Sequence, residues 1–155
     1  MNFIDNRTRA IGEMALNGLQ ERAKAIGANT VNVLTPNYQR KEVSFEQSLQ
    51  NVIQRENEKE EIKLQNSAMY QKNPEMVLKG QSPAQIAFMN TAFNEGYSID
   101  VSTDTSDALG LDGNNVNLES EMMDEAKNGM RYQVVASLLS KSYAMMNTIV
   151  KGQNQ

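Results

Sequence analysis

Apolar side chains recur along the last forty residues of the chain at the spacing of an α-helix. The bands lie three, four or seven residues apart, which keeps them on one side of the helix. Met123, Val134 and Met145 are eleven residues apart, so the stripe drifts little around a straight helix. The pattern predicts a long amphipathic helix that follows a turn at residues 112–115 and ends near Lys151. The methionines of the stripe fit either an ordinary core or an interface that adapts to inexact neighbours. Six stripe residues are predicted to lie in an interface: Met122, Met130, Val134, Leu138, Met145 and Ile149.

A second apolar stripe runs from about Phe3 to Val33 and predicts another long amphipathic helix. Gly18 lies on this stripe, where its missing side chain would let another helix approach closely. Pro36 ends the helix, because proline lacks the N–H group and forces the preceding residue toward extended geometry. The segment Thr35-Pro36-Asn37-Tyr38 then fits a tight turn, with Asn37 able to adopt a positive φ. The stripe residues predicted to pack against the C-terminal helix, within one subunit or between two, are Ile11, Leu19 and Ile26.

Each predicted terminal helix has an apolar side that needs partners along its whole length. We expect the two helices to pair as a helical hairpin or coiled coil, with other copies of the chain covering the rest of the stripes. The predicted fold class is therefore mainly α, with a small irregular middle region of short helices and a possible short β-strand. In this division residues 1–45 and 112–155 form one discontinuous domain, and residues 46–111 form a variable middle region.

The middle region carries weaker patterns. The segments Ser44–Gln47 and Ser82–Gln85 both have the form of a helix capping box, and the second also has Pro at the first helical position. The charge-rich segment Arg55–Lys63 predicts either a solvent-facing helix or a mobile segment. Gly96 is expected to end the helix that follows Ser82. Apolar and polar residues alternate from Tyr97 to Val101, which indicates a short strand.

The composition narrows the class of protein. A chain of 155 residues has room for one ordinary domain, but 39% apolar residues and a mean hydropathy of −0.57 make a lean core. The net charge is −4, and between residues 80 and 126 there are nine acids and no Lys or Arg. This segment is either a solvated acidic face or a surface that docks on a basic neighbour.

The chain has no Cys, His or Trp. This excludes thiol nucleophiles, disulfides, His-ligated metals and His-based catalytic triads. The acids around Asp112 do not match a calcium-binding loop, because Gly113 falls at its second position instead of its sixth. The sequence therefore predicts no enzyme, no cofactor, no metal site and no nucleic-acid partner. It also predicts no cleaved signal peptide and no direct insertion into a membrane.

Two motifs, one near each end of the chain, resemble the bacterial flagellar basal-body rod protein family. The segment Ala28–Tyr38 is similar to the N-terminal signature of flagellar rod and hook proteins, with Asn37 where the family usually has Gly. Asn substitutes well for Gly at positive φ. The turn that opens the C-terminal helix is similar to that of the proximal-rod members, and the chain is too short for the extra domains of hook and distal-rod proteins. The motif residues are Asn29, Asn32, Thr35, Pro36, Asn37 and Tyr38 in the first segment, and Asp112, Gly113, Asn114, Asn115 and Val116 in the second.

The resemblance implies a structural subunit of the proximal rod, whose paired terminal helices line a tubular drive shaft. The implied partners are other copies of the chain, FlgC, distal rod proteins, the rod-base adaptor FliE and the MS ring. The implied location is the periplasmic rod of the flagellar basal body, reached through the flagellar export apparatus. The alternatives are the sister proximal-rod protein FlgC, which fits the second motif less well, and a soluble helical adaptor or secretion chaperone.

Overall fold

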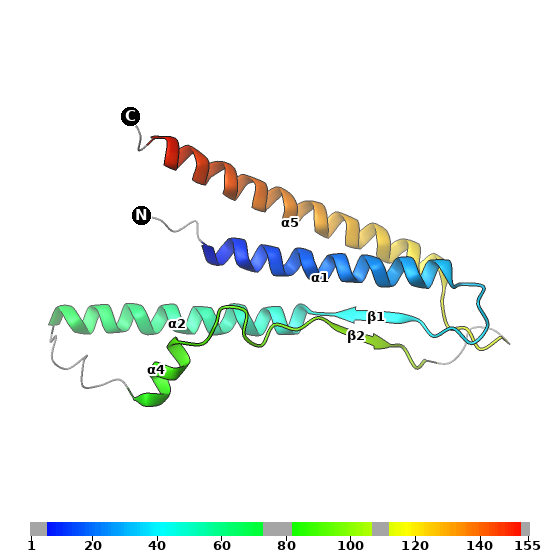
Figure 1. Cartoon of the computed structure of the whole chain (residues 1–155), viewed down its shortest axis with the longest axis horizontal. Helices are drawn as coiled ribbons and strands as arrows, with labels where there is room; N and C mark the ends of the chain where they lie inside the picture. The colour runs from blue at the N-terminus through cyan, green and yellow to red at the C-terminus, as the bar shows by residue number, and fades with distance from the viewer. Residues whose placement is uncertain (1–5, 73–81, 107–111, 153–155) are drawn as a thin grey trace. The chain divides into compact units, whose positions relative to one another are not determined.

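The computed structural model describes residues 6–72, 82–106 and 112–152 of the chain (Figure 1). It is mainly helical, with long terminal helices, which confirms the predicted fold class. The helices are α1 (Asn6–Val31), α2 (Glu46–Lys72), α4 (Pro83–Met89) and α5 (Leu118–Gly152), and the strands are β1 (Lys41–Ser44) and β2 (Asp100–Thr103). The chain forms two compact units: Met1–Glu46 with Ile99–Gln155, and Gln47–Ser98.

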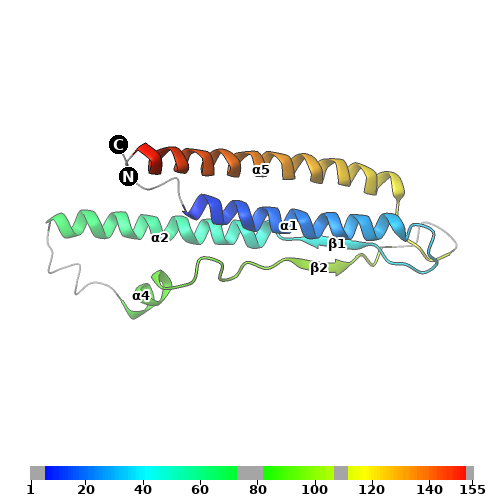
Figure 2. The same cartoon turned by 45° about the horizontal axis from the view of Figure 1, so that its top comes forward.

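Helices α1 and α5 lie side by side and antiparallel in both views (Figures 1 and 2). Apolar side chains of both helices are buried between them, among them Leu19 and Leu139. Polar bonds fix the antiparallel register: the Asn128 amide donates to the carbonyl oxygen of Leu19 at 2.9 Å, and Tyr143 Oη donates to Glu13 Oε1 at 2.7 Å. The predicted pairing of the terminal helices is therefore confirmed.

Gly18 allows a close approach to α1, but its neighbour is an aromatic ring. A Cβ atom added to Gly18 would lie 2.5 Å from Cδ2 of Phe45, whose side chain is buried. The guanidinium of Arg22 lies over the same ring, 4.9 Å from its centroid, and forms a 2.6 Å ion pair with Glu46. This bond to Arg22 lowers the pKa of the Glu46 carboxyl to about 2, so Glu46 remains charged at neutral pH. The absence of a side chain at Gly18 thus makes room for Phe45, the residue that follows β1. The sequence suggested instead that a second helix approaches at this position.

Strands β1 and β2 form a two-stranded antiparallel sheet in which Val43 pairs with Val101. The alternation at residues 97–101 predicted a strand, and the structure places it at β2. Its partner β1 has the polar sequence Lys-Glu-Val-Ser, which carries no clear strand signal. The other edge of β1 is covered by side chains of α1: Asn29 bonds both the N–H and the C=O of Lys41, and Arg22 donates to the carbonyl oxygen of Val43. Helix α1 therefore takes the place of a third strand.

The second unit contains α4 and the charge-rich segment of α2. The helical alternative for that segment is confirmed, and α2 is 27 residues long, longer than the short helices expected in the middle region. Two cations of α2 hold the chain after α4: Arg55 donates to the carbonyl oxygen of Phe93 at 2.8 Å, and the buried Lys59 donates to that of Thr91 at 2.9 Å. These bonds explain why so polar a helix is ordered.

Three expected helix signals have different outcomes. The capping box at Ser82 and Gln85 is present and starts α4. The one expected at Ser44 is not formed, because Ser44 belongs to β1 and α2 begins at Glu46. Gly96 adopts a positive φ of 78°, but α4 has already ended at Met89, so Gly96 serves a later turn.

Candidate functional site

The two sequence motifs meet at one end of the α1–α5 pair. We call this meeting point the motif junction and define it as residues 29–41 together with 112–121. The segment Thr35–Tyr38 forms the predicted tight turn, closed by a 3.2 Å bond from the N–H of Tyr38 to the carbonyl oxygen of Thr35. Asn37 has a φ of 61°, as the third position of a type II turn requires. The prediction for this turn is confirmed.

Asn114 connects the second motif to the end of α1. Its side chain is buried, and its amide nitrogen donates to the carbonyl oxygens of Asn32, Val33 and Thr35 at 2.9, 3.1 and 2.8 Å. The last carbonyl groups of a helix have no partner within the helix. These three carbonyl groups follow the end of α1 at Val31, so Asn114 holds the turn after α1 from a segment about eighty residues away in sequence. Its oxygen accepts the N–H of Val116, which fixes the direction of the chain entering α5.

Backbone contacts hold the two turns together. The N–H of Asn37 donates to the carbonyl oxygen of Asp112 at 2.8 Å. Gly113 has a φ of 76°, and a Cβ atom there would lie 2.6 Å from Oδ1 of Asn37. Gly113 is thus needed both for its backbone conformation and for the close approach of Asn37.

Asn32 and Asn115 fasten the two sides of the junction locally. The Asn32 amide donates to the carbonyl oxygen of Ala28, and its oxygen accepts the hydroxyl of Thr35, which completes the end of α1. Oδ1 of Asn115 accepts the N–H of Arg40 at 2.6 Å, and its amide donates to the carbonyl oxygen of Asp104 at 2.9 Å. Asn115 therefore ties the start of β1 to the segment that follows β2.

The centre of the junction is a buried polar cluster of Asn29, Tyr38, Arg40 and Glu121. Both Asn29 and Glu121 are fully buried, with 0% of their surface exposed. Glu121 accepts a 2.5 Å bond from Nε of Arg40 and a 3.1 Å bond from the Asn29 amide. Oδ1 of Asn29 accepts the hydroxyl of Tyr38 at 3.2 Å. Every member thus bonds to at least one other, as a buried polar network must to be stable.

The cluster shifts the acid–base properties of two of its members. Burial raises the pKa of the Tyr38 hydroxyl, and the negative charge of Glu121 raises it further. Burial alone would lower the pKa of the Arg40 guanidinium, but its bonds to Glu121 and Glu42 outweigh this effect, so the pKa rises above its usual value. Tyr38 is therefore neutral and Arg40 charged at neutral pH, which suits permanent bonding and offers no proton for transfer.

The predicted interface residues fall into two groups. Leu19 and Ile26 are buried and Ile11 is half-buried, on the side of α1 that packs in the first unit. The stripe residues of α5 lie on its outer face, which we define by Met122, Met130, Val134, Leu138 and Met145, each between 50% and 61% exposed. The side chain of Ile149 lies outside the described residues. The residues of α5 that face inward include Glu121, Asn128 and Leu139.

Sequence reasoning assigned no structural role to Arg40 or to Glu121. A signal for Glu121 existed: it precedes the buried Asn128 by seven residues, so both lie on the inner side of α5. A carboxylate at such a position needs a buried partner. For Arg40 no local pattern existed, because its partner lies 81 residues away.

The described residues contain no group of three acids, cysteines or histidines that could hold a metal ion. None of the described helices is both long and apolar enough to cross a membrane. The motif junction fixes the end of α1, the start of α5 and the sheet in one geometry.

A substitution series at Asn37 tests this interpretation. Asn37→Gly should leave stability within about 0.5 kcal/mol, because Gly adopts a positive φ without strain. Asn37→Val should destabilise the chain by about 1–3 kcal/mol, because a β-branched residue is strained there. Urea unfolding of the purified chains measures both. Equal stability of the Gly and Val variants would show that the turn does not require a positive φ.

Comparisons with known proteins give a consistent assignment. No protein-family model matches the chain. The chain is 31% identical over 141 residues to the flagellar basal body rod protein FlgB of Bacillus subtilis, a match that covers 90% of each protein. It is 30% identical over 139 residues to FlgB of Escherichia coli, covering 89% of each, and 24% identical over 136 residues to FlgB of Borreliella burgdorferi, covering 88% of the chain and 90% of that protein. With both motifs joined in one folded unit and relatives matched over nearly their whole length, the chain belongs to the FlgB family of flagellar basal body rod proteins.

Proposed function

We propose that the chain is a structural subunit of the proximal rod, packing side by side with copies of itself and with other rod proteins in the tubular drive shaft. The observation that carries this proposal is the outer face of α5. Five large apolar side chains lie along one helix, each at least half exposed. A row of large exposed apolar side chains on a folded chain indicates an interaction site.

The motif junction supports the proposal in a second way. Its polar side chains hold backbone groups of α1, β1 and α5, and its titratable members are bonded to one another. Such an arrangement gives the helical pair a defined shape, so that the outer face of α5 is presented in the same way by every copy. A subunit of a regular assembly needs a defined shape more than it needs a reactive side chain.

The partners and location follow from the family resemblance. We assign the contacts of this subunit to FlgC, the distal rod proteins, the adaptor FliE and the MS ring. The corresponding location is the periplasmic part of the basal body, after export without a cleaved signal peptide.

Acidic substitutions on the outer face of α5 test the assembly. Val134→Glu combined with Leu138→Glu should abolish motility and remove the rod from isolated basal bodies, because two charges would be buried without partners at each contact. Protein level and helix content by circular dichroism should remain unchanged, since both side chains are exposed in the single chain. The measurements are a swimming assay and immunoblots of basal bodies from cells that carry only the variant.

The matched control is Gln65→Glu, which adds a charge at an exposed position of a different helix, α2. We expect normal swimming from this variant. Normal swimming of cells with the Val134→Glu and Leu138→Glu variant would refute the assignment of this face to assembly.

A further inference from the structure

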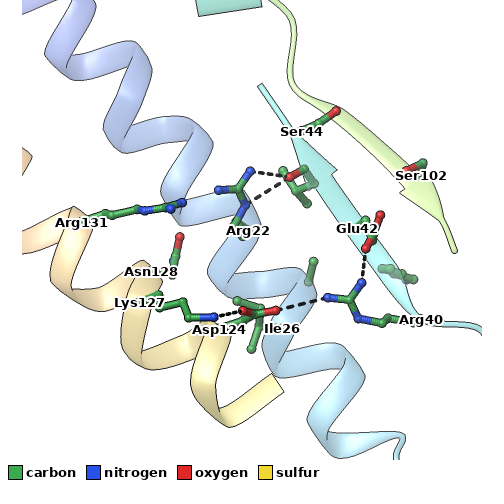
Figure 3. A pocket seen from close by; sticks show the side chains of 13 residues that line it. Arg22, Ile26, Arg40, Glu42, Ser44, Ser102, Asp124, Lys127, Asn128 and Arg131 are labelled. Carbon is green, nitrogen blue, oxygen red and sulfur yellow. Dashed lines mark hydrogen bonds and ion pairs between the residues drawn. The ribbon is translucent and has the colours of Figure 1, made fainter. Parts of the chain in front are cut away.

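A groove with a cavity of about 400 Å³ lies between α1, β1 and α5 (Figure 3). Helix α5 contributes Asp124, Lys127, Asn128 and Arg131 to its wall, α1 contributes Arg22, and β1 contributes its whole length. The groove adjoins the buried cluster of the motif junction, with which it shares Arg40.

The charges that line the groove are unbalanced. Five cations line it (Arg22, Arg40, Lys41, Lys127 and Arg131) against two acids (Glu42 and Asp124). Arg22 and Arg40 are held in short bonds to Glu46 and Glu121. Lys127 and Arg131 make only long contacts, 3.3 Å to Asp124 and 4.0 Å to Glu46, and their side chains are 58% and 63% exposed. These two cations are therefore available to an anionic partner.

Asn128 gives a second, independent indication of an occupant. It is only 5% exposed, and its amide nitrogen donates to the carbonyl oxygen of Leu19 at 2.9 Å. This bond fixes the orientation of the amide. Its buried oxygen, Oδ1, accepts no hydrogen bond from the part of the chain that the structure describes. A buried acceptor of this kind needs a donor, which an N–H or O–H group of the occupant or a water molecule between them can supply.

The rim of the groove is continuous with the outer face of α5. Lys127, Arg131, Val134 and Leu138 follow one another at steps of four, three and four residues, which places them on one side of the helix. A partner that covers Val134 and Leu138 therefore also reaches Lys127 and Arg131. Its surface must combine apolar side chains with carboxylates.

The N-terminal turns of α5 present such a surface. Leu118, Met122, Met123 and Ala126 form an apolar patch that shares no residue with the groove. Two exposed acids, Glu119 and Glu125, belong to the same turns, and no Lys or Arg occurs between residues 80 and 126.

We infer that the groove of one copy binds the acidic N-terminal turns of α5 of a second copy. This inference rests on the proposed function, because it specifies how neighbouring subunits meet. Glu119 and Glu125 face Lys127 and Arg131, the apolar patch covers Val134 and Leu138, and a polar hydrogen of the second copy reaches Oδ1 of Asn128. Since the two surfaces are different parts of one chain, the contact is head to tail and continues from copy to copy in an open helical array.

Cysteine crosslinking in cells tests the contact, because the chain has no cysteine of its own. Ser102→Cys places a thiol at the wall of the groove, and Ala126→Cys places one in the apolar patch. Both positions are exposed, and neither substitution changes a charge. In motile cells treated with a short bismaleimide, the two single variants expressed together should give a crosslinked dimer. The chain that carries both cysteines should give a ladder of dimers, trimers and longer species.

Charge reversal supplies the specificity control. Lys127→Glu with Arg131→Glu should reduce the crosslink yield more than about tenfold, and Glu119→Lys with Glu125→Lys should do the same, because like charges then face each other. All four reversals in one chain should restore the yield, whereas Lys63→Glu, on the exposed part of α2, should leave it unchanged. Circular dichroism of the purified variants verifies that each remains folded.

The outcomes separate this inference from the proposed function. Crosslinks between copies through Val134→Cys, without any between Ser102→Cys and Ala126→Cys, would overturn the groove contact and leave the rod assignment standing. Ser102–Ala126 crosslinks that are insensitive to both charge reversals would also overturn it. Intact rods that lack the protein would overturn both proposals.

Discussion

Glu121→Ala should lower the free energy of unfolding by about 3–5 kcal/mol, the usual cost of removing one partner of a buried ion pair. Glu121 is fully buried and bonds both Arg40 and Asn29. Without it, the guanidinium of Arg40, whose side chain is only 19% exposed, loses its shortest buried partner. Asn29 also loses one acceptor, although its bonds to Lys41 remain. The penalty therefore comes mainly from the guanidinium, which keeps only more exposed partners such as Glu42 and Asp124.

Urea unfolding of the purified chain, followed by circular dichroism, measures this effect. Glu125→Ala is the matched control, because it removes an exposed acid from the same helix and should change stability by no more than about 0.5 kcal/mol. Glu121→Gln keeps the shape but loses the charge and can accept only one of the two hydrogen bonds, so its cost should fall between the two. If Glu121→Ala and Glu125→Ala proved equally mild, the buried cluster would not hold the two motifs together.

Much of this fold is visible in the sequence because its main signals are local. The stripes of the terminal helices repeat within a few residues, and the turn at Thr35–Tyr38 is defined by the chemistry of Pro36 and Asn37. The capping box at Ser82 is local in the same sense. In each case the residue that specifies the structure lies within about one turn of the place where the structure forms.

The parts that sequence reasoning missed depend on distant partners. Strand β1 exists because β2 pairs with it and because Asn29 and Arg22 of α1 bond its other edge. Ser44 could cap a helix in isolation, but pairing with Asp100 places it in the strand. Arg40 acquires its role only when α5 brings Glu121 to it. The spacing of apolar residues within one segment carries no information about such contacts.

The motifs thus work as matching halves of one junction. Asn114 holds the turn that follows α1, Asn115 fastens the start of β1, and Gly113 makes room for Asn37. The side-chain amides of Asn114 and Asn115 bond backbone groups, which every residue carries regardless of its side chain. An asparagine-rich junction can therefore set the angle between two long helices while the outer face of α5 remains free to suit its neighbours.

The second large effect on stability is expected at Gly18 and Gly27 of α1, whose surroundings differ. Gly18 is buried, and a Cβ atom there would lie 2.5–2.6 Å from two ring carbons of Phe45. Gly27 is exposed, and a Cβ atom there meets nothing within 4 Å. Both are inside the same helix, so the gain in helix propensity from Gly to Ala, about 1 kcal/mol, is common to both.

Gly27→Ala should therefore stabilise the chain by about 0.5–1 kcal/mol, whereas Gly18→Ala should destabilise it by about 1–3 kcal/mol, because overpacking outweighs the gain in propensity. The Phe45 ring cannot shift away from the added Cβ atom without displacing its neighbours, since it is buried and lies under the guanidinium of Arg22. Urea unfolding midpoints measure both signs in one experiment. Phe45→Leu should cost less in the Gly18→Ala background than in the parent chain, because the smaller side chain relieves the clash. A Gly18→Ala variant as stable as Gly27→Ala would show that the Phe45 ring does not pack against α1 at this position.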